Sequence, residues 1–183
     1  DTVDIQLFEE PTSAAAGADQ EVCGDTATLA ANTPTVGTGQ WTIVTGDGNG
    51  YFSGTPGTLT SSNPTDSFTG TRDTSYTLRW TVSNGTCLDS FDDMNIEFFD
   101  DPTPADAGPD QTGAQGVCGS TATLQANSII NVGTGSWSIT GVADGNGSIA
   151  DVNNPMSSFS GSIGQTYTLT WTVSNGNCAD SLD

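Results

Sequence analysis

Residues 76–87 read YTLRWTVSNGTC, and residues 167–178 read YTLTWTVSNGNC. Apolar and polar side chains alternate over the first seven positions of each copy, which is the period of a strand with one face in a core. The Asn-Gly pair that follows favours the positive φ angles of a tight hairpin. Because a core strand and its turn recur together, the sequence predicts a repeated domain.

The repeat extends along almost the whole chain of 183 residues. Equivalent residues 91 positions apart are Pro11 and Pro102, Phe68 and Phe159, Trp80 and Trp171, and Cys87 and Cys178. We expect residues 1–10 to be the terminal strand of a preceding repeat and residues 11–100 to be repeat 1. Residues 101–183 are then repeat 2 without its last strand. The chain therefore looks like a window from a longer polymer, which is either covalent or assembled.

Short strand patterns separated by Gly, Pro, Asn and Asp occupy each repeat, and no segment shows a helical period. In repeat 1 we expect seven strands, the first over residues 14–23. This spacing is typical of an immunoglobulin-like sandwich. The fold prediction is all-β: tandem seven-stranded immunoglobulin-like β-sandwiches arranged end to end. The alternation makes the large aromatic residues core residues instead of a sugar-stacking surface; they are Trp41, Phe68, Tyr76 and Trp80.

The net charge is -20, and Arg72 and Arg79 are the only basic side chains. Nucleic acid is excluded as a partner because no phosphates could be neutralised. Anionic membrane surfaces repel such a chain, and no apolar run predicts membrane insertion in this segment. Without His or Lys, and with its carboxylates in linkers and at strand edges, the chain is predicted not to be an enzyme.

Several motifs resemble a known group of repeats. Residues 14–20 (AAAGADQ) and 105–111 (ADAGPDQ), together with the YTL-x-WTVSNG strand, resemble PKD-type immunoglobulin-like repeats. The added CG-x-TATL and NG-x-C motifs are similar to the variant in giant cell-surface proteins of Bacteroidetes, which include gliding-motility adhesins. The PKD hallmark Trp-x-Phe-Gly-Asp-Gly is not kept, because Thr42-Ile43 follow Trp41, so the label is PKD-like.

The four cysteines, two in each repeat, predict an oxidising, extracellular or cell-surface location. One disulfide inside each repeat is one alternative, Cys23–Cys87 and Cys118–Cys178. Cys23 and Cys87 are expected at opposite ends of a sandwich, about 23 Å apart along a seven-residue strand, whereas a disulfide needs Cα atoms within about 7 Å. The other alternative is an interdomain bond between Cys23 and Cys178, with Cys87 and Cys118 bonded to neighbouring units.

Two further kinds of site are candidates. The Asp-Gly-Asn-Gly loops place oxygen ligands at alternate positions, so Asp47 and Asn49, and Asp144 and Asn146, are candidate calcium ligands. Turn chemistry on a solvated acidic surface is the alternative interpretation. The resemblance to the bacterial group also implies O-glycosylation in Asp-Ser/Thr-apolar triplets, at Thr2, Thr26 and Ser181.

The function predicted from these features is structural. We expect a non-catalytic repeat unit of an extracellular filament or adhesin stalk, whose partners are adjacent copies of the same repeat. The copies join end to end covalently or by exchange of the strand formed by residues 1–10. The alternative is a calcium-dependent or glycan-binding adhesion module.

Overall fold

The repeated stretch forms the central strand of each half of the chain, as β7 (Ser75–Ser83) and β13 (Thr168–Ser174). The computed structural model describes residues 1–130, 132–141 and 145–183. These residues form two units, Asp1–Phe99 (unit 1) and Asp100–Asp183 (unit 2). All extended elements in both units are strands, and no helix in the described part of the chain is long and apolar enough to cross a bilayer.

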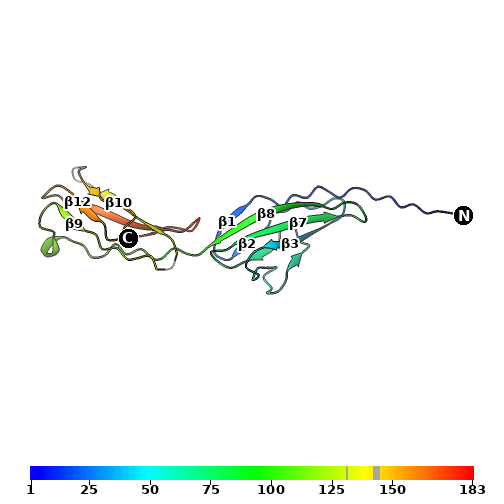
Figure 1. Cartoon of the computed structure of the whole chain (residues 1–183), viewed down its shortest axis with the longest axis horizontal. Coiled ribbons are helices and arrows are strands. Elements are labelled where there is room, and N and C mark those ends of the chain that lie inside the picture. The colour runs from blue at the N-terminus through cyan, green and yellow to red at the C-terminus, as the bar shows by residue number, and fades with distance from the viewer. Residues whose placement is uncertain (131, 142–144) are drawn as a thin grey trace. The chain divides into compact units, whose positions relative to one another are not determined.

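Unit 1 is a sandwich of two sheets (Figure 1). The larger sheet has the order β1-β8-β7-β3-β5, and the smaller has the order β2-β6-β4. Strand β8 pairs antiparallel with β7 on one side and parallel with β1 on the other. The remaining strands are β1 (Gln20–Cys23), β2 (Thr26–Thr28), β3 (Thr38–Thr45), β4 (Tyr51–Phe52), β5 (Thr60–Ser61), β6 (Ser67–Thr69) and β8 (Ser90–Phe99).

The core of unit 1 lies between the two sheets and is aromatic. Trp41 and Trp80 face each other across β3 and β7, with ring centroids 5.2 Å apart. Phe68 from the smaller sheet packs on Tyr76 and Phe98 from the larger one. The predicted core residues Trp41, Phe68, Tyr76 and Trp80 are each at most 1% exposed, which confirms their assignment to the core.

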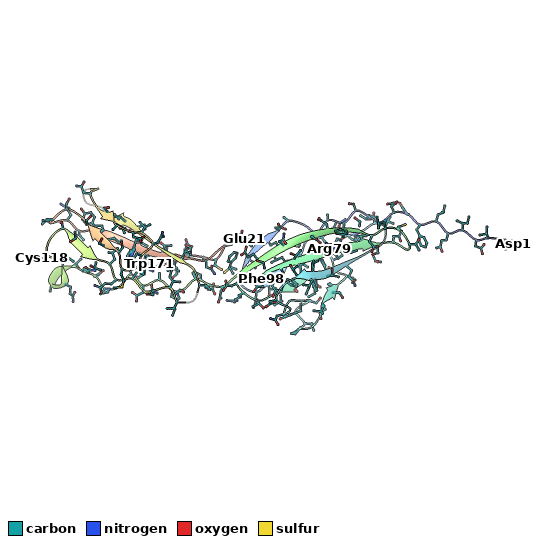
Figure 2. All side chains as sticks on the ribbon, viewed as in Figure 1. Asp1, Glu21, Arg79, Phe98, Cys118 and Trp171 are labelled. Atoms are coloured by element: carbon teal, nitrogen blue, oxygen red, sulfur yellow. The ribbon has the colours of Figure 1, made fainter. Side chains whose placement is uncertain are left out.

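Unit 2 repeats this plan with fewer strand residues. Its sheets have the orders β10-β13-β14 and β11-β12-β9. Trp137 and Trp171 form the same cross-strand pair, with centroids 5.2 Å apart. Figure 2 shows Trp171 among the strands of this unit. The strands are β9 (Thr121–Thr123), β10 (Thr134–Gly141), β11 (Ser148–Ile149), β12 (Ser158–Ser160) and β14 (Ser181–Leu182), and η1 (Gly113–Gln115) is one 3₁₀ turn.

The all-β immunoglobulin-like fold class is confirmed, and two details of unit 1 differ from the prediction. The first strand begins at Gln20 and not at residue 14. Before it, Ala14 and Ala16 donate their backbone N–H groups to the side chains of Ser90 and Asp92, at 2.9 and 2.8 Å, instead of to a neighbouring backbone. The two-residue strand β4 was not predicted.

Candidate functional site

The hairpin that follows β7 holds the chain entering unit 1. The side-chain amide of Asn84 donates to the backbone carbonyl of Glu9 at 2.7 Å, and the Cys87 thiol donates to the same oxygen at 3.4 Å. Gly85 has a φ of +61°, and a Cβ on it would lie 2.5 Å from the Phe8 ring. The Asn-Gly turn therefore forms a hairpin and also contacts residues 8 and 9.

Unit 2 contains the same arrangement. The side-chain amide of Asn175 donates to the carbonyl of Asp100 at 2.8 Å, and Cys178 Sγ lies 3.3 Å from that oxygen. Asn175 and Asp100 are the equivalents of Asn84 and Glu9. Each NG-x-C motif thus places its cysteine sulfur beside the carbonyl of the residue two positions before Pro11 or Pro102.

The other cysteine of each repeat lies three residues before a short strand, which is β2 in unit 1 and β9 in unit 2. In unit 1, Cys23 is the last residue of β1 and pairs with Phe99 in the parallel register, and Gly24 N–H donates to the Phe99 carbonyl at 2.9 Å. In unit 2 the equivalent Cys118 is exposed and is labelled in Figure 2.

The four cysteines are in two different chemical states. Cys23 and Cys178 are disulfide-bonded, whereas Cys87 and Cys118 are free thiols. One disulfide inside each repeat is therefore wrong, because Cys23–Cys87 and Cys118–Cys178 pairing would use both of the cysteines that are free.

The first two calcium candidates, Asp47 and Asn49, lie in a loop in which the Asp47 carboxylate already accepts hydrogen bonds. Asn49 donates to both carboxylate oxygens of Asp47, through its backbone N–H at 3.0 Å and its side-chain amide at 2.8 Å. The Tyr76 hydroxyl donates to Asp47 Oδ1. Hydrogen bonds from Thr71 and Tyr76 hold the pKa of Asp47 well below its usual range. This is the geometry of an Asx turn, and calcium binding there stays a prediction.

The second calcium candidate loop is described only in part. Asp144 lies outside the described residues. The side-chain amide of Asn146 donates to the Ser162 hydroxyl at 3.4 Å.

The three glycosylation candidates differ in their surroundings. Thr2 lies in the exposed N-terminal segment. Thr26 is exposed on β2, and its hydroxyl donates to Asp25 at 3.0 Å. Ser181 is half-buried, and its Oγ accepts a 2.8 Å hydrogen bond from Ala105 N–H, which a sugar on that oxygen would disturb.

Unit 2 also contains a groove of about 620 Å³, which the sequence did not predict. It is lined by residues of both sheets and by a glycine-rich loop, and polar side chains such as Gln111, Gln125 and Gln165 stand beside the apolar ones. Residues on its walls include Val117, Leu124, Phe159, Tyr167 and Leu169.

The residues of unit 1 that are equivalent to these groove residues are buried. Leu78 and Tyr76 are at most 1% exposed, whereas their equivalents Leu169 and Tyr167 are only half-buried. In unit 1, β8 pairs with β7 over the eight residues from Ser75 to Val82. In unit 2, β14 pairs with β13 at Thr172 and Val173 only. The groove therefore lies where unit 1 has the second half of β8.

No family model and no curated protein matches this chain. Among solved structures, the chain is similar to "Protocadherin Gamma B2 extracellular cadherin domains 3-6", with a TM-score of 0.39 and 8% identity over 94% of this chain and 50% of that one. It is also similar to a "Marsupial T cell receptor", with a TM-score of 0.23 and 14% identity over 97% of this chain and 62% of that one. The chain thus spans between half and two thirds of these structures.

Proposed function

We propose that this chain is a non-catalytic structural unit of an extracellular filament or adhesin stalk, and that cysteine bonds join successive units. The observation that carries the proposal is the division of the cysteines. One cysteine of each repeat is disulfide-bonded and the other is a free thiol, although the repeats are equivalent in sequence.

Contacts inside each unit support a bond between Cys23 and Cys178. Cys23 is aligned with Phe99 in the parallel register of unit 1. Cys178 Sγ lies 3.3 Å from the carbonyl of Asp100 in unit 2. Because Phe99 and Asp100 are consecutive residues, both cysteines flank one peptide bond. A bond between them would staple the two units at the point where the chain passes from one to the other.

Because the two repeats have equivalent cysteines, the same kind of bond can join neighbouring copies. Cys118 is the equivalent of Cys23, and Cys87 is the equivalent of Cys178. Each free thiol therefore lacks the partner that its equivalent has inside the chain. We infer that Cys118 of one copy bonds Cys87 of the next, so that every junction carries the same staple. A chain of such junctions resists pulling, because each bond limits the extension of its linker.

Composition supports an extracellular structural role. A net charge of -20 keeps a long polymer soluble, and the absence of His and Lys leaves few groups for acid–base or nucleophilic chemistry. The PKD-like motifs favour a surface fibre of the Bacteroidetes type, and disulfide chemistry favours a location outside the cell.

Peptide mapping without reduction tests the staple. We expect a Cys23–Cys178 cross-link within one 18.7 kDa chain. Under mild oxidation we also expect Cys87–Cys118 cross-links between chains, seen as a ladder on a non-reducing gel. Cys87→Ser and Cys118→Ser should each abolish the ladder, and reduction should collapse it to one band. A Cys23–Cys87 peptide, or a ladder that survives in Cys118→Ser, would overturn the proposal.

A further inference from the structure

The first and last strands of unit 1 are neighbours that run in the same direction. Strand β1 pairs parallel with β8, and the aligned residues run from Gln20 with Ile96 to Cys23 with Phe99. Figure 1 shows the two strands side by side. The chain enters unit 1 ahead of β1 and leaves it at the end of β8. Tension on the flanking segments therefore pulls β1 and β8 in opposite directions along their own axes.

Side chains of β8 continue this contact ahead of β1. Ser90 Oγ accepts a hydrogen bond from the Ala14 N–H at 2.9 Å, and Asp92 Oδ2 accepts one from the Ala16 N–H at 2.8 Å. A hydrogen bond to a charged acceptor is stronger than one between neutral groups. The two side chains thus tie the segment before β1 to the same strand that β1 itself joins.

The register of these contacts is continuous. The Asn95 N–H donates to the Asp19 carboxylate at 2.8 Å. This bond and the two bonds made by Ala14 and Ala16 each join residues 76 positions apart, as do the aligned residues of β1 and β8. Residues 14–23 therefore lie along residues 90–99 as one parallel segment.

We propose that unit 1 bears tension, and that residues 14–23 together with residues 90–99, which we call the parallel pair, form the element that resists it. The inference deepens the proposed function, because a stalk has to transmit force. It rests on that function for the source of the tension.

The direction of pulling decides how strongly the parallel pair resists. Bonds between parallel strands are evenly spaced, so all of them are loaded together when the two strands are pulled past each other. If the same strands are pulled apart from one end, the bonds break one after another. Forced unfolding is governed by the unfolding rate, and a barrier at which all bonds break together is crossed more slowly.

Core packing also opposes sliding. Ala16 from one segment, and Ile96 and Phe98 from the other, are 0% exposed. Because side chains alternate between the two faces of a sheet, a slip of one residue would turn the exposed Glu21 toward the core. Sliding therefore breaks hydrogen bonds and disrupts the core in the same step.

Unit 2 contains the same side-chain ties. The Ala105 N–H donates to Ser181 Oγ and the Ala107 N–H donates to Asp183 Oδ2, both at 2.8 Å. These residues are again 76 positions apart. A Ser-x-Asp sequence therefore ties the entering segment in both units.

The parallel pair and the proposed disulfide carry tension under different redox conditions. If Cys23 is bonded to Cys178, tension that enters ahead of residue 14 runs along the covalent chain to Cys23 and leaves through the bond. The fold after Cys23 is then not loaded. Reduction of the bond transfers the tension to the parallel pair.

Single-molecule pulling of the full chain in two directions tests the parallel pair. Both chains carry Cys23→Ser, Cys118→Ser and Cys178→Ser. The shear chain also carries Cys87→Ser and Asp101→Cys, so that handles on residue 101 and on the N-terminus pull the two segments past each other. The peel chain keeps Cys87, three residues before β8, so that the same two segments are pulled apart from one end.

Unit 1 should unfold in the peel chain at a force at least about twofold lower than in the shear chain, because its bonds are loaded one at a time. Unfolding in urea should be the same for the two chains, since urea has no direction. Equal unfolding forces in the two directions overturn the proposal.

Variants of two neighbouring carboxylates test the side-chain ties. Asp92→Ala removes the acceptor of the Ala16 N–H and should lower the unfolding force of the shear chain, whereas Asp92→Asn keeps an acceptor oxygen and should restore most of it. Asp93→Ala is the matched control, because Asp93 binds Arg79 at 2.7 Å instead of the entering segment. Equal losses of force in Asp92→Ala and Asp93→Ala overturn the role of the ties.

Failure of this inference and failure of the proposed function are distinguishable. Both pulling chains lack the Cys23–Cys178 bond, so the comparison of directions decides the parallel pair whether or not that bond exists. With Cys23 and Cys178 retained and oxidised, pulling from the two ends should release no length from residues 24–99 until a reductant is added. Release of that length without a reductant overturns the disulfide of the proposed function and leaves the parallel pair standing.

Discussion

The side-chain amide of Asn84 lies 2.7 Å from the backbone carbonyl of Glu9, 75 residues earlier in the chain, and donates a hydrogen bond to it. Asn175 makes the same bond to Asp100 in unit 2, at 2.8 Å. The residue that begins each tight hairpin thus also fixes the chain that enters the sandwich. This arrangement gives the NG-x-C motif a role in the linker as well as in the turn.

Loss of the hydrogen bond from Asn175 to the Asp100 carbonyl should destabilise unit 2. Asn175→Ala removes one hydrogen bond that crosses between distant segments, so we expect the free energy of unfolding to fall by about 1 kcal/mol. Thermal and urea unfolding followed by circular dichroism would measure it. Asn153→Ala is the matched control, because the hydrogen bond of Asn153 to Asp151 uses its backbone N–H and not its side chain. Equal midpoints for the two variants would contradict a stabilising role for this hydrogen bond.

The contact between Gly39 and Trp80 leaves no room for a side chain. A Cβ on Gly39 would lie 2.0 Å from Cζ2 of Trp80, and Gly135 has the same relation to Trp171 at 2.2 Å. Both indoles are fully buried. Gly39→Ala should therefore force the core apart and lower the stability of unit 1 by about 3 kcal/mol, at the upper end for overpacking.

Gly57→Ala separates this steric effect from backbone strain. Gly57 has a φ of +86°, but no heavy atom lies within 4 Å of a Cβ built on it. Gly57→Ala should therefore lower the free energy of unfolding only by the cost of a positive φ for alanine, about 1–2 kcal/mol. Calorimetry of the two variants should show the larger loss of stability for Gly39→Ala. The reverse order would show that the Trp80 indole can move aside.

The sequence predicted the elements whose pattern is local. The alternation from Tyr76 to Val82 is visible in one strand, and burial follows it residue by residue. The start of β1 was not predictable in this way. Ala14 and Ala16 look like strand residues, yet their N–H groups bind side chains of Ser90 and Asp92, 76 residues away.

The groove of unit 2 was also missed, because it depends on a difference between two similar segments. Val22 and Val117 have the same local motif, and only Val22 has a strand partner. Which residue lies beside each one is a property of the sheet and not of the motif. The disulfide states likewise depend on segments distant in the sequence, which spacing alone left as two alternatives.

Acid should weaken unit 1 partly through Asp47. Hydrogen bonds from Thr71 and Tyr76 lower the pKa of Asp47 below its unfolded value of about 3.9. A lowered pKa gives stability that is present above the unfolded pKa and is lost as pH falls through the folded one. Asp47→Asn should therefore lower the melting temperature at pH 7, and the gap to the parent chain should narrow below about pH 4.

The exposed Asp89 provides the control for the loss of one carboxylate. Asp89→Asn should leave the melting temperature at pH 7 close to that of the parent chain. The same melts test calcium. Because Asn49 and Tyr76 already donate to the Asp47 carboxylate, melting curves with calcium and with a chelator that superimpose would favour an Asx turn without a bound cation. A calcium-dependent rise in the parent chain that Asp47→Asn abolishes would instead establish the loop as a cation site.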